Sequence, residues 1–475
     1  MKEISIECCI MGAGPAGLAA AIELVKSGKT DLMIIDRNSI AGGLSRTEVR
    51  DNYRFDVGPH RFFTPNEEIN ALWHNTLGKD FIPVNRLTRI YYRNKFFNYP
   101  IKAGDVLGKL PVTELAHAIF SFGVAKMKSN SNEQTFEDWV SNRFGRKLFN
   151  TFFKTYTEKV WGIPCNEIGA EWASQRIKGL DSIQVIKNSF QSSSNNKPKT
   201  LVDQFDYPVL GAGQMYETWL EQAVEKGAKA SLSTSIKKIN VQDNAIKSIE
   251  CVDENGEEMI IRAQQFISSI PLTHFFYLQD NVADNIKKSV DALYYREHIT
   301  VDLLLDGEEY FPDQWIYIHA PDVKMARIAN YNNFSKAMVN NEKKTGLSIE
   351  YFVFQTDELW KMSDKDIIDL AVDELVRMKL ASKEKVLQAW VVRETESYPT
   401  YYLGFKEHYE LLKNTMDSIT NVLPVGRGGM YKYNNQDHSI ISGLLAARNY
   451  VQNRNFNLWD INIDAEYHEG AKRSN

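Results

Sequence analysis

Apolar positions at the start of the chain predict a strand, a tight turn, a helix and a second strand. A short apolar run over residues 4–11 leads into Gly-Ala-Gly-Pro-Ala-Gly, and residues 18–28 then repeat apolar side chains with the period of a helix. A second apolar run, DLMIIDR, ends at Asp36. Elements in this order predict a βαβ unit, in which the two strands lie parallel in one sheet.

The pattern changes several times further along the chain. Residues from about 105 to 191 are helical and aromatic, and the polar stretch QSSSNNKPKT at 191–200 predicts an exposed loop or lid. A helix at MYETWLEQAVEKG is followed by predicted strands at LSTSIKKINVQ, AIKSIECVD and EMIIRAQQFISSIP. Residues 299–392 alternate in the manner of strands around one helix, DKDIIDLAVDELVRM, and a glycine-rich turn and a last helix occupy 426–450.

These patterns predict a protein of the α/β plus α+β class. At 475 residues the chain is too long for one small core. We expect a discontinuous Rossmann-type domain that is interrupted by a helical insertion and by a domain with a mixed or antiparallel sheet. The predicted boundaries are 1–98, 205–275 and 405–455 for the dinucleotide domain, 99–204 for the helical substrate or lid domain, 276–404 for the sheet substrate domain and 456–475 for a tail.

Composition excludes several classes of protein. A net charge of -5 argues against nucleic-acid binding. The four cysteines are too few and too irregularly spaced for a disulfide framework or a zinc site, which favours reduced thiols in a cytosolic protein. The N-terminus lacks the shape of a signal peptide, and no apolar run approaches the length of a membrane span. We therefore expect a cytoplasmic protein, and the sequence leaves a homo-oligomer open.

The first turn has the composition of a dinucleotide site. Gly12, Gly14 and Gly17 form G-x-G-x-x-G between the predicted strand and helix, which permits a tight turn, close approach to a pyrophosphate and close helix packing. The helix N-terminus would offer free N–H groups to phosphates. Asp36, about twenty residues on, stands where a carboxylate accepts a ribose hydroxyl. A glycine-rich turn without a ligand is the alternative interpretation.

The segments that follow favour FAD over NAD. GGLSRT, which contains Arg46 and Thr47, follows Asp36 and again offers glycines that let the backbone approach a ligand closely. A distant glycine-rich segment precedes the last helix. The N-terminus of that helix would stabilise negative charge on a reduced flavin. The predicted cofactor-binding residues are Gly12, Gly14, Pro15, Ala16, Gly17, Asp36, Arg37, Gly43, Leu44, Ser45, Gly58, Pro59, His60, Ile236, Gly426, Arg427, Asn435, Gln436, Asp437 and Ser439.

Seven motifs resemble those of the UDP-galactopyranose mutases, in the same order along nearly the whole chain. They are GAGPAGLAAA, GGLSRT, DVGPH, KVWGIP, RIANYNNFS, YPT and NNQDHS. The resemblance implies that N5 of reduced FAD attacks the anomeric carbon of a nucleoside-diphosphate sugar. The resulting flavin–sugar adduct would let the sugar interconvert between pyranose and furanose without net redox. NAD(P)H is the candidate reductant.

The resemblance also assigns roles to single residues. His60, Arg176 and Arg327 would be catalytic, with the two arginines holding the diphosphate, which suits the fork shape of guanidinium. Tyr433, or Tyr431 after a small shift, would bind the same diphosphate together with Tyr398. The complete predicted substrate set is Phe63, Tyr99, Thr157, Trp161, Arg176, Trp315, Tyr317, Arg327, Tyr398, Tyr431 and Tyr433.

Departures from the mutase pattern leave the base and the sugar open. Pro59 replaces a glycine, Thr157 replaces an asparagine, and Ile101 and Lys102 replace an aromatic residue and an amide. Two other functions stay open, namely an FAD oxidase or desaturase of the protoporphyrinogen or carotenoid type, and a flavin-binding subunit without catalysis. The apolar stretch ELAHAIFSFGVAKMK suits the oxidase or desaturase. Aromatic residues are most often core and arginines most often form surface ion pairs, so each assignment rests on its motif.

Overall fold

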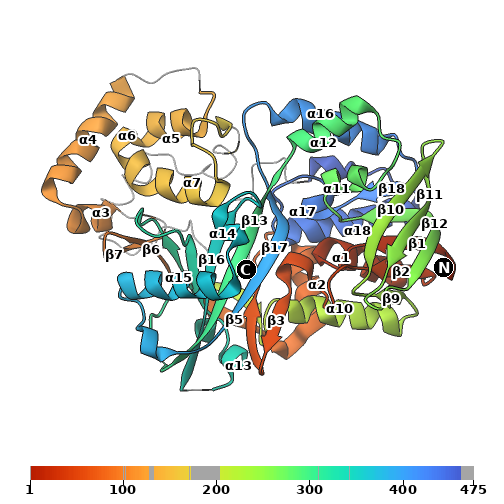
Figure 1. Cartoon of the computed structure of the whole chain (residues 1–475), viewed down its shortest axis with the longest axis horizontal. Helices are drawn as coiled ribbons and strands as arrows, with labels where there is room; N and C mark the ends of the chain where they lie inside the picture. Colours follow the sequence, from red (N-terminus) through yellow and green to blue (C-terminus); the bar gives the residue numbers. More distant parts are fainter. Residues whose placement is uncertain are drawn as a thin grey trace.

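In the part of the chain that the structure describes, two seven-stranded sheets, two two-stranded sheets and a group of helices form the fold (Figure 1). The computed structural model describes residues 2–99, 101, 103–127, 133–170, 172, 204–308, 310–341 and 343–461. The predicted class is confirmed, because both sheets are present with helices around them.

The first sheet contains the predicted βαβ unit. Its strand order is β10 (Ser235–Gln242), β11 (Ala245–Val252), β12 (Glu258–Ser268), β1 (Lys2–Met11), β2 (Leu32–Ile35) and β9 (Lys229–Ser231), with β18 (Val422–Pro424) beside β12. β1 runs parallel to both β2 and β12. Helix α1 (Pro15–Lys26) packs against α10 (Gly213–Glu225) and α18 (Gln436–Gln452). All four residues of β2 are buried, as expected for a central parallel strand.

The second sheet is mostly antiparallel. Its order is β17 (Val386–Pro399), β13 (Tyr295–Asp306), β16 (Lys344–Val353), β15 (Arg327–Asn330), β14 (Trp315–Ile318), β6 (Thr88–Tyr92) and β7 (Lys95–Asn98). Helix α15 (Asp364–Arg377) packs on β17 and β13, which confirms the predicted helix in this region. The predicted boundary at residue 98 would assign β6 and β7 to the dinucleotide domain, whereas β6 pairs with β14 and so extends the second sheet. Strand patterning does not reveal which sheet a strand joins.

A helical insertion lies beside the second sheet, at the upper left of Figure 1. Its elements are α3 (Ala103–Lys109), α4 (Val112–Met127), α5 (Phe136–Phe144), α6 (Arg146–Leu148), the π-helix η3 (Phe149–Lys154) and α7 (Thr155–Trp161). Helical structure predicted from residue 105 onward is therefore confirmed as far as Trp161. The predicted lid at 191–200 and Arg176 lie outside the described residues.

Shorter elements connect these three parts. They are η1 (Gly43–Ser45), β3 (Thr47–Arg50), β4 (Tyr53–Asp56), α2 (Glu67–Leu77), η2 (Gly78–Asp80), β5 (Phe81–Asn85), β8 (Gln204–Pro208), α11 (Leu272–Tyr277), α12 (Asp284–Ala292), η4 (Tyr331–Asn333), α13 (Lys336–Val339), α14 (Glu358–Lys361), η5 (Lys383–Lys385), α16 (Phe405–Asp417), α17 (Gly426–Gly429) and η6 (Leu458–Asp460). The four cysteines are buried and free. Within the ranges given above, no helix is long and apolar enough to cross a membrane.

Candidate functional site

One large cavity connects the first sheet, the second sheet and the helical insertion. Its volume is about 2570 Å³, whereas a pocket for one drug-sized ligand measures roughly 300–1,000 Å³. All predicted cofactor residues except Gly17 line it, and so do all predicted substrate residues except Arg176, which is not described. The cavity therefore has room for a dinucleotide and a second ligand together.

The glycine turn forms one end of the cavity. Gly12 has φ +113°, and a Cβ there would lie 2.0 Å from Oγ of Ser269. A Cβ on Gly17 would lie 1.9 Å from the carbonyl oxygen of Gly12, so this residue serves the packing of helix on strand and does not face the ligand. A Cβ on Gly14 would meet only the Gly43 backbone, at 3.7 Å. The position of Gly14 thus leaves open space for a ligand beside the N-terminus of α1.

Asp36 stands next to this turn with two of its acceptor sites engaged. Its carboxylate accepts hydrogen bonds of 2.7 Å from the backbone N–H groups of Ala13 and Asn38. Burial raises the pKa of Asp36, while these two N–H groups oppose the rise. Because a carboxylate has about four acceptor positions, Asp36 keeps capacity for the ribose hydroxyl that the sequence predicts there.

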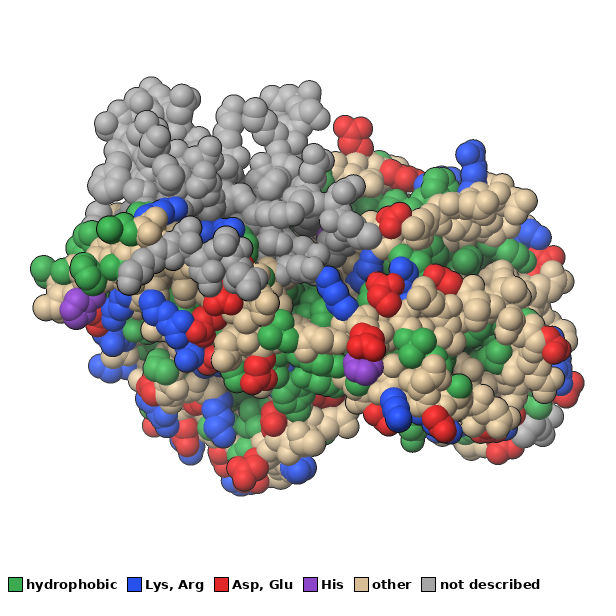
Figure 2. All heavy atoms as spheres, turned by 90° about the horizontal axis from the view of Figure 1, so that it is seen from above, with side chains coloured by type: hydrophobic (Ala, Val, Ile, Leu, Met, Phe, Trp, Pro, Cys, Tyr) green, Lys and Arg blue, Asp and Glu red, His purple; other side chains and the backbone are tan. Residues whose placement is uncertain are grey.

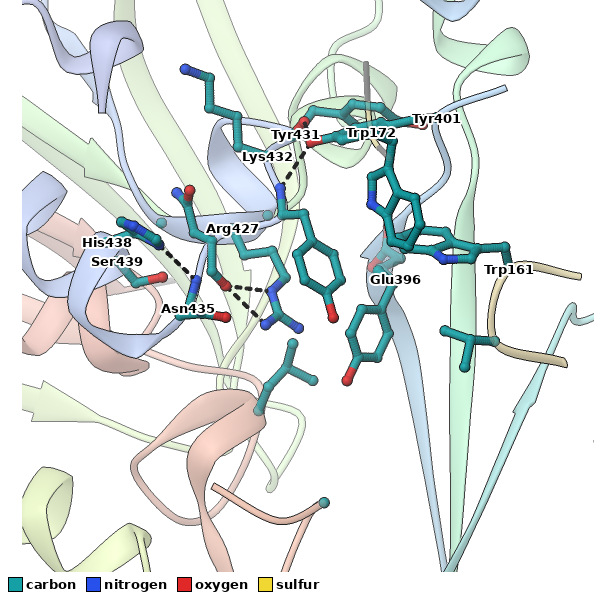
Figure 3. A pocket seen from close by; sticks show the side chains of 18 of the residues that line it. Trp161, Trp172, Glu396, Tyr401, Arg427, Tyr431, Lys432, Asn435, His438 and Ser439 are labelled. Carbon is teal, nitrogen blue, oxygen red and sulfur yellow. Dashed lines mark hydrogen bonds between the residues drawn. The ribbon is translucent and has the colours of Figure 1, made fainter. Parts of the chain in front are cut away.

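The C-terminal segment brings a second long helix to the same cavity. In Figure 3, Asn435, His438 and Ser439 lie together at the start of α18. The backbone N–H of Asn435 donates to Nδ1 of His438 at 3.2 Å, and Thr64 donates its hydroxyl to Asp437 at 3.0 Å. Two helix N-termini, of α1 and α18, therefore approach one cavity, which favours a ligand with negative charge at both places.

Arg427 is fixed between this helix and the aromatic wall of the cavity (Figure 3). Its Nε and Nη2 donate to the carbonyl oxygen of Asn434 at 3.0 and 2.8 Å, and its Nη1 donates to that of Ser397 at 3.1 Å. The guanidinium lies 4.7 Å from the ring centre of Tyr398 and 5.2 Å from that of Tyr433. A positive charge is thus held rigidly in the middle of the cavity.

His60 is a neutral group that faces the cavity. Burial, together with the charges of Arg427 and Arg327, lowers the pKa of His60 to about 3. His60 is therefore uncharged at neutral pH, with a proton on one ring nitrogen only, which argues against proton donation by an imidazolium. Its buried Nδ1 has no hydrogen-bond partner among the described residues. Because buried polar atoms are nearly always paired, this atom is a candidate contact for a ligand in the cavity.

Two buried histidines make the folded protein sensitive to acid. Burial is the main cause that lowers the pKa of both His60 and His319 to about 3, whereas an unfolded histidine titrates near pH 6.5. Between these values only the unfolded chain takes up the proton. The free energy of unfolding should therefore fall by about 1.4 kcal/mol per pH unit for each histidine as the pH drops below about 6.5. Urea unfolding at pH 7, 6 and 5 measures this slope.

The matched variant is His319→Phe, which keeps an aromatic ring beside Tyr156. It should remove about 1.4 kcal/mol per pH unit from the slope, whereas the exposed His117→Gln should leave the slope unchanged. An unaltered slope in His319→Phe would show that this histidine protonates in the folded state.

Arg327 is held by a carboxylate that the sequence analysis missed. Its Nε and Nη2 both donate to Glu350, which also accepts a hydrogen bond of 2.8 Å from Nε2 of His298. Burial alone would raise the pKa of Glu350, but Arg327 and His298 lower it to about 2. A Cβ on Gly58 would lie 3.2 Å from the same carboxylate. Glu350 thus connects Arg327 to the loop that carries His60.

Aromatic rings form the walls around Arg327. Trp161 lies 4.9 Å from Trp172 and 5.5 Å from Tyr433, measured between ring centres, and Tyr433 stacks on Tyr398 at 5.4 Å. The predicted residues Phe63, Tyr99, Thr157, Trp315 and Tyr317 line the cavity. The cavity is also lined by Trp172, Tyr156 and His319, which no sequence motif indicates. Tyr156 shares α7 with Thr157 and Trp161, but it is not three or four residues from either, so helical spacing does not point to it.

The choice between Tyr433 and Tyr431 depends on their hydroxyl groups. The Tyr431 hydroxyl donates to the carbonyl oxygens of Tyr294 at 2.9 Å and Thr400 at 3.1 Å, and its ring is buried. Tyr433 instead presents its ring beside Arg427. The geometry therefore favours Tyr433 as the second tyrosine of the predicted pair.

Sequence comparisons match parts of the chain to known mutases, to a desaturase and to a Rossmann-like domain. A profile for an NAD(P)-binding Rossmann-like domain matches residues 10–76. The chain is 33% identical over 170 residues to a probable UDP-galactopyranose mutase of Klebsiella pneumoniae, covering 34% of this chain and 42% of that protein. It is 28% identical over 170 residues to a dTDP-fucopyranose mutase of Escherichia coli, covering 34% and 43%.

A third relative is the 1-hydroxycarotenoid 3,4-desaturase of Flavobacterium sp. (strain P99-3), at 24% identity over 50% of this chain and 52% of that protein. The chain thus spans about half the length of these curated relatives, or less.

Structural comparison covers the whole chain. The structure of reduced UDP-galactopyranose mutase superposes with a TM-score of 0.83 at 20% identity, covering 98% of this chain and 97% of the other. The protein has the fold of a UDP-galactopyranose mutase. A putative protoporphyrinogen oxidase from Exiguobacterium follows with a TM-score of 0.71 at 14% identity, covering 95% and 99%. The resemblance to the mutases that the sequence motifs indicate is thereby confirmed, and the mutase fold accounts for both sheets and the cavity between them.

Proposed function

We propose that the protein is an FAD-dependent mutase that interconverts the pyranose and furanose forms of a nucleotide sugar. One observation carries this proposal: a single cavity joins the two helix N-termini, where a dinucleotide fits, to Arg327 and a stacked pair of tyrosines, which suit a diphosphate. Relatives named as mutases of UDP-galactopyranose and dTDP-fucopyranose support it.

The residues present fit FAD at the first end of the cavity. The glycine turn and the start of α1 would hold the pyrophosphate, Asp36 the ribose, and the segment from Arg427 to Ser439 the isoalloxazine end. When bound and reduced, FAD supplies a nucleophilic nitrogen. The fixed charge of Arg427 and the start of α18 would favour the electron-rich reduced form.

The chain's own residues would orient the sugar and stabilise its leaving group. Arg327, held by Glu350, presents a positive charge to the diphosphate, and the hydroxyl groups of Tyr398 and Tyr433 add donors. Neutral His60 offers its unpaired Nδ1 as an acceptor or, in the other tautomer, as a donor. The rings of Trp161 and Trp172 exclude water from this part of the cavity, which strengthens these interactions.

A trapping experiment tests the proposal. The protein with FAD bound is reduced with dithionite, mixed with UDP- or dTDP-hexoses and quenched with cyanoborohydride, and the flavin is analysed by mass. We expect a flavin–sugar conjugate with at least one nucleotide sugar, and none with the oxidised enzyme, because only reduced flavin is a nucleophile. No conjugate with any sugar, combined with rapid oxidation of an apolar substrate, would rule out the mutase.

An FAD-dependent oxidase or desaturase is the second candidate. The partial similarity to a carotenoid desaturase and an apolar arm of the cavity, lined by Leu148, Phe152 and Phe153, favour it. The two functions differ in electron balance, since an oxidase reduces its flavin stoichiometrically under anaerobic conditions and a mutase does not. Absorbance of the oxidised flavin during anaerobic turnover distinguishes them. The same assay with NAD(P)H tests whether it is the reductant.

A further inference from the structure

The solvent-facing side of α4 is mostly apolar, with Thr113, His117 and Lys126 as its exposed polar residues. Its exposed side chains include Val112, Ile119, Phe120, Val124 and Met127, of which Phe120 is 74% and Met127 88% exposed. Their spacings place them on one face of the helix. Surface helices of globular proteins normally turn a polar face to water, so this face, which we call the α4 surface, has the character of a binding surface.

Basic side chains lie on the segments next to α4. Glu114 of α4 pairs with Arg93 and Lys147, and on the neighbouring α5 and α6 Glu137 pairs with Arg146. In each pair the base is the more exposed partner, as with Arg146 at 57% and Glu137 at 18%. Figure 2 shows green apolar and blue basic side chains side by side at the end of the molecule that carries α4. The more exposed charges of these pairs are therefore basic, although the chain carries -5 overall.

The α4 surface is continuous with the apolar arm of the cavity. Leu115, Ala118, Ile119 and Phe122 of α4 line the cavity, and Ile119 is also exposed on the α4 surface. Behind them, Leu148, Phe152 and Phe153 lead toward Tyr156 and Arg327. An apolar path thus connects the outer face of the helical insertion with the part of the cavity that holds the substrate arginine.

We propose that the α4 surface docks the protein on an anionic lipid membrane, with the apolar arm of the cavity at the bilayer. Apolar side chains on one helical face with basic residues around them combine the two contributions that hold peripheral proteins on such membranes. A second copy of this chain suits the surface less, because two basic rims would repel each other, whereas anionic headgroups neutralise them. The proposal concerns location and access and stands whether the enzyme is a mutase or an oxidase.

Flotation with lipid vesicles tests the proposal. The protein is mixed with phosphatidylcholine vesicles or with vesicles that also contain phosphatidylglycerol. We expect binding to the anionic vesicles, at least roughly tenfold weaker binding of Phe120→Glu, and about fivefold weaker binding of Arg146→Gln. The matched controls are Leu387→Glu and Lys365→Glu, which change exposed residues of the second sheet and its helix α15 and should bind like the unaltered protein.

Three outcomes would overturn the membrane site. They are no binding to either vesicle, equal binding of Phe120→Glu and the unaltered protein, and equal binding to neutral and anionic vesicles. Light scattering on the same samples detects a dimer, and a dimer lost in Phe120→Glu would assign the surface to a second copy instead. Circular dichroism confirms that each variant is folded. Because no turnover is measured, failure here is distinct from failure of the mutase.

Discussion

Replacing Gly14 by valine should abolish retention of the dinucleotide while the apoprotein stays folded. Gly14 has φ -83°, which any residue can adopt, and a Cβ there meets only the Gly43 backbone at an ordinary 3.7 Å. The added methyl groups would instead occupy the space beside the N-terminus of α1, where the pyrophosphate fits. We expect affinity for FAD to fall at least about 100-fold, or about 2.7 kcal/mol.

Gly17→Val is the informative contrast. Its side chain would collide with the carbonyl oxygen of Gly12, so we expect it to destabilise the protein with or without FAD. Gly108→Val, at a position with no atom within 4 Å, is the control for the change in residue type. Fluorimetric titration of the apoprotein with FAD and thermal unfolding of each apoprotein separate the two effects. Normal FAD binding by Gly14→Val would place the pyrophosphate elsewhere.

Most of what could be predicted about the fold and the candidate site came from motifs that are contiguous in the sequence. The turn from Gly12 to Gly17, the acid at Asp36 and the C-terminal segment are contiguous motifs, and the fold brings them into one cavity as expected. Glu350 and His298 were missed because their role depends on the register of β13, β15 and β16, where Arg327 pairs with Glu350. A strand pattern gives the face on which a residue lies but not its partner across the sheet.

Helix α4 and His60 each combine one property that the sequence predicts with one that depends on the fold. The apolar character of α4 was visible in the sequence, but such a stretch is compatible with a buried helix, and only the structure places Phe120 in solvent. His60 was predicted at the cavity from its motif. Its lowered pKa, however, follows first from burial in the folded protein and then from the charges of Arg427 and Arg327, which are hundreds of residues away in the sequence.

Replacing Arg327 by alanine should weaken both substrate binding and folding. Loss of a charged hydrogen-bonding partner should reduce the affinity for UDP by about 1.5–3 kcal/mol. The same change leaves Glu350, which is fully buried, with His298 as its remaining partner in the ion-pair cluster. Stranding a buried charge typically costs about 3–5 kcal/mol, so the unfolding free energy should fall as well. Calorimetric titration with UDP and urea unfolding measure the two quantities.

A double variant separates the two losses. Arg327→Ala combined with Glu350→Gln no longer strands a charge, so it should regain part of the stability but none of the affinity for UDP. Arg262→Ala, which removes an exposed arginine 3.8 Å from Glu3, should change stability by less than about 1 kcal/mol and leave UDP binding unaltered. Recovery of affinity in the double variant would mean that Arg327 acts only by neutralising Glu350. Unchanged affinity in Arg327→Ala would remove this residue from the diphosphate site, because the loss of affinity expected here depends on direct contact between the guanidinium and the phosphate oxygens.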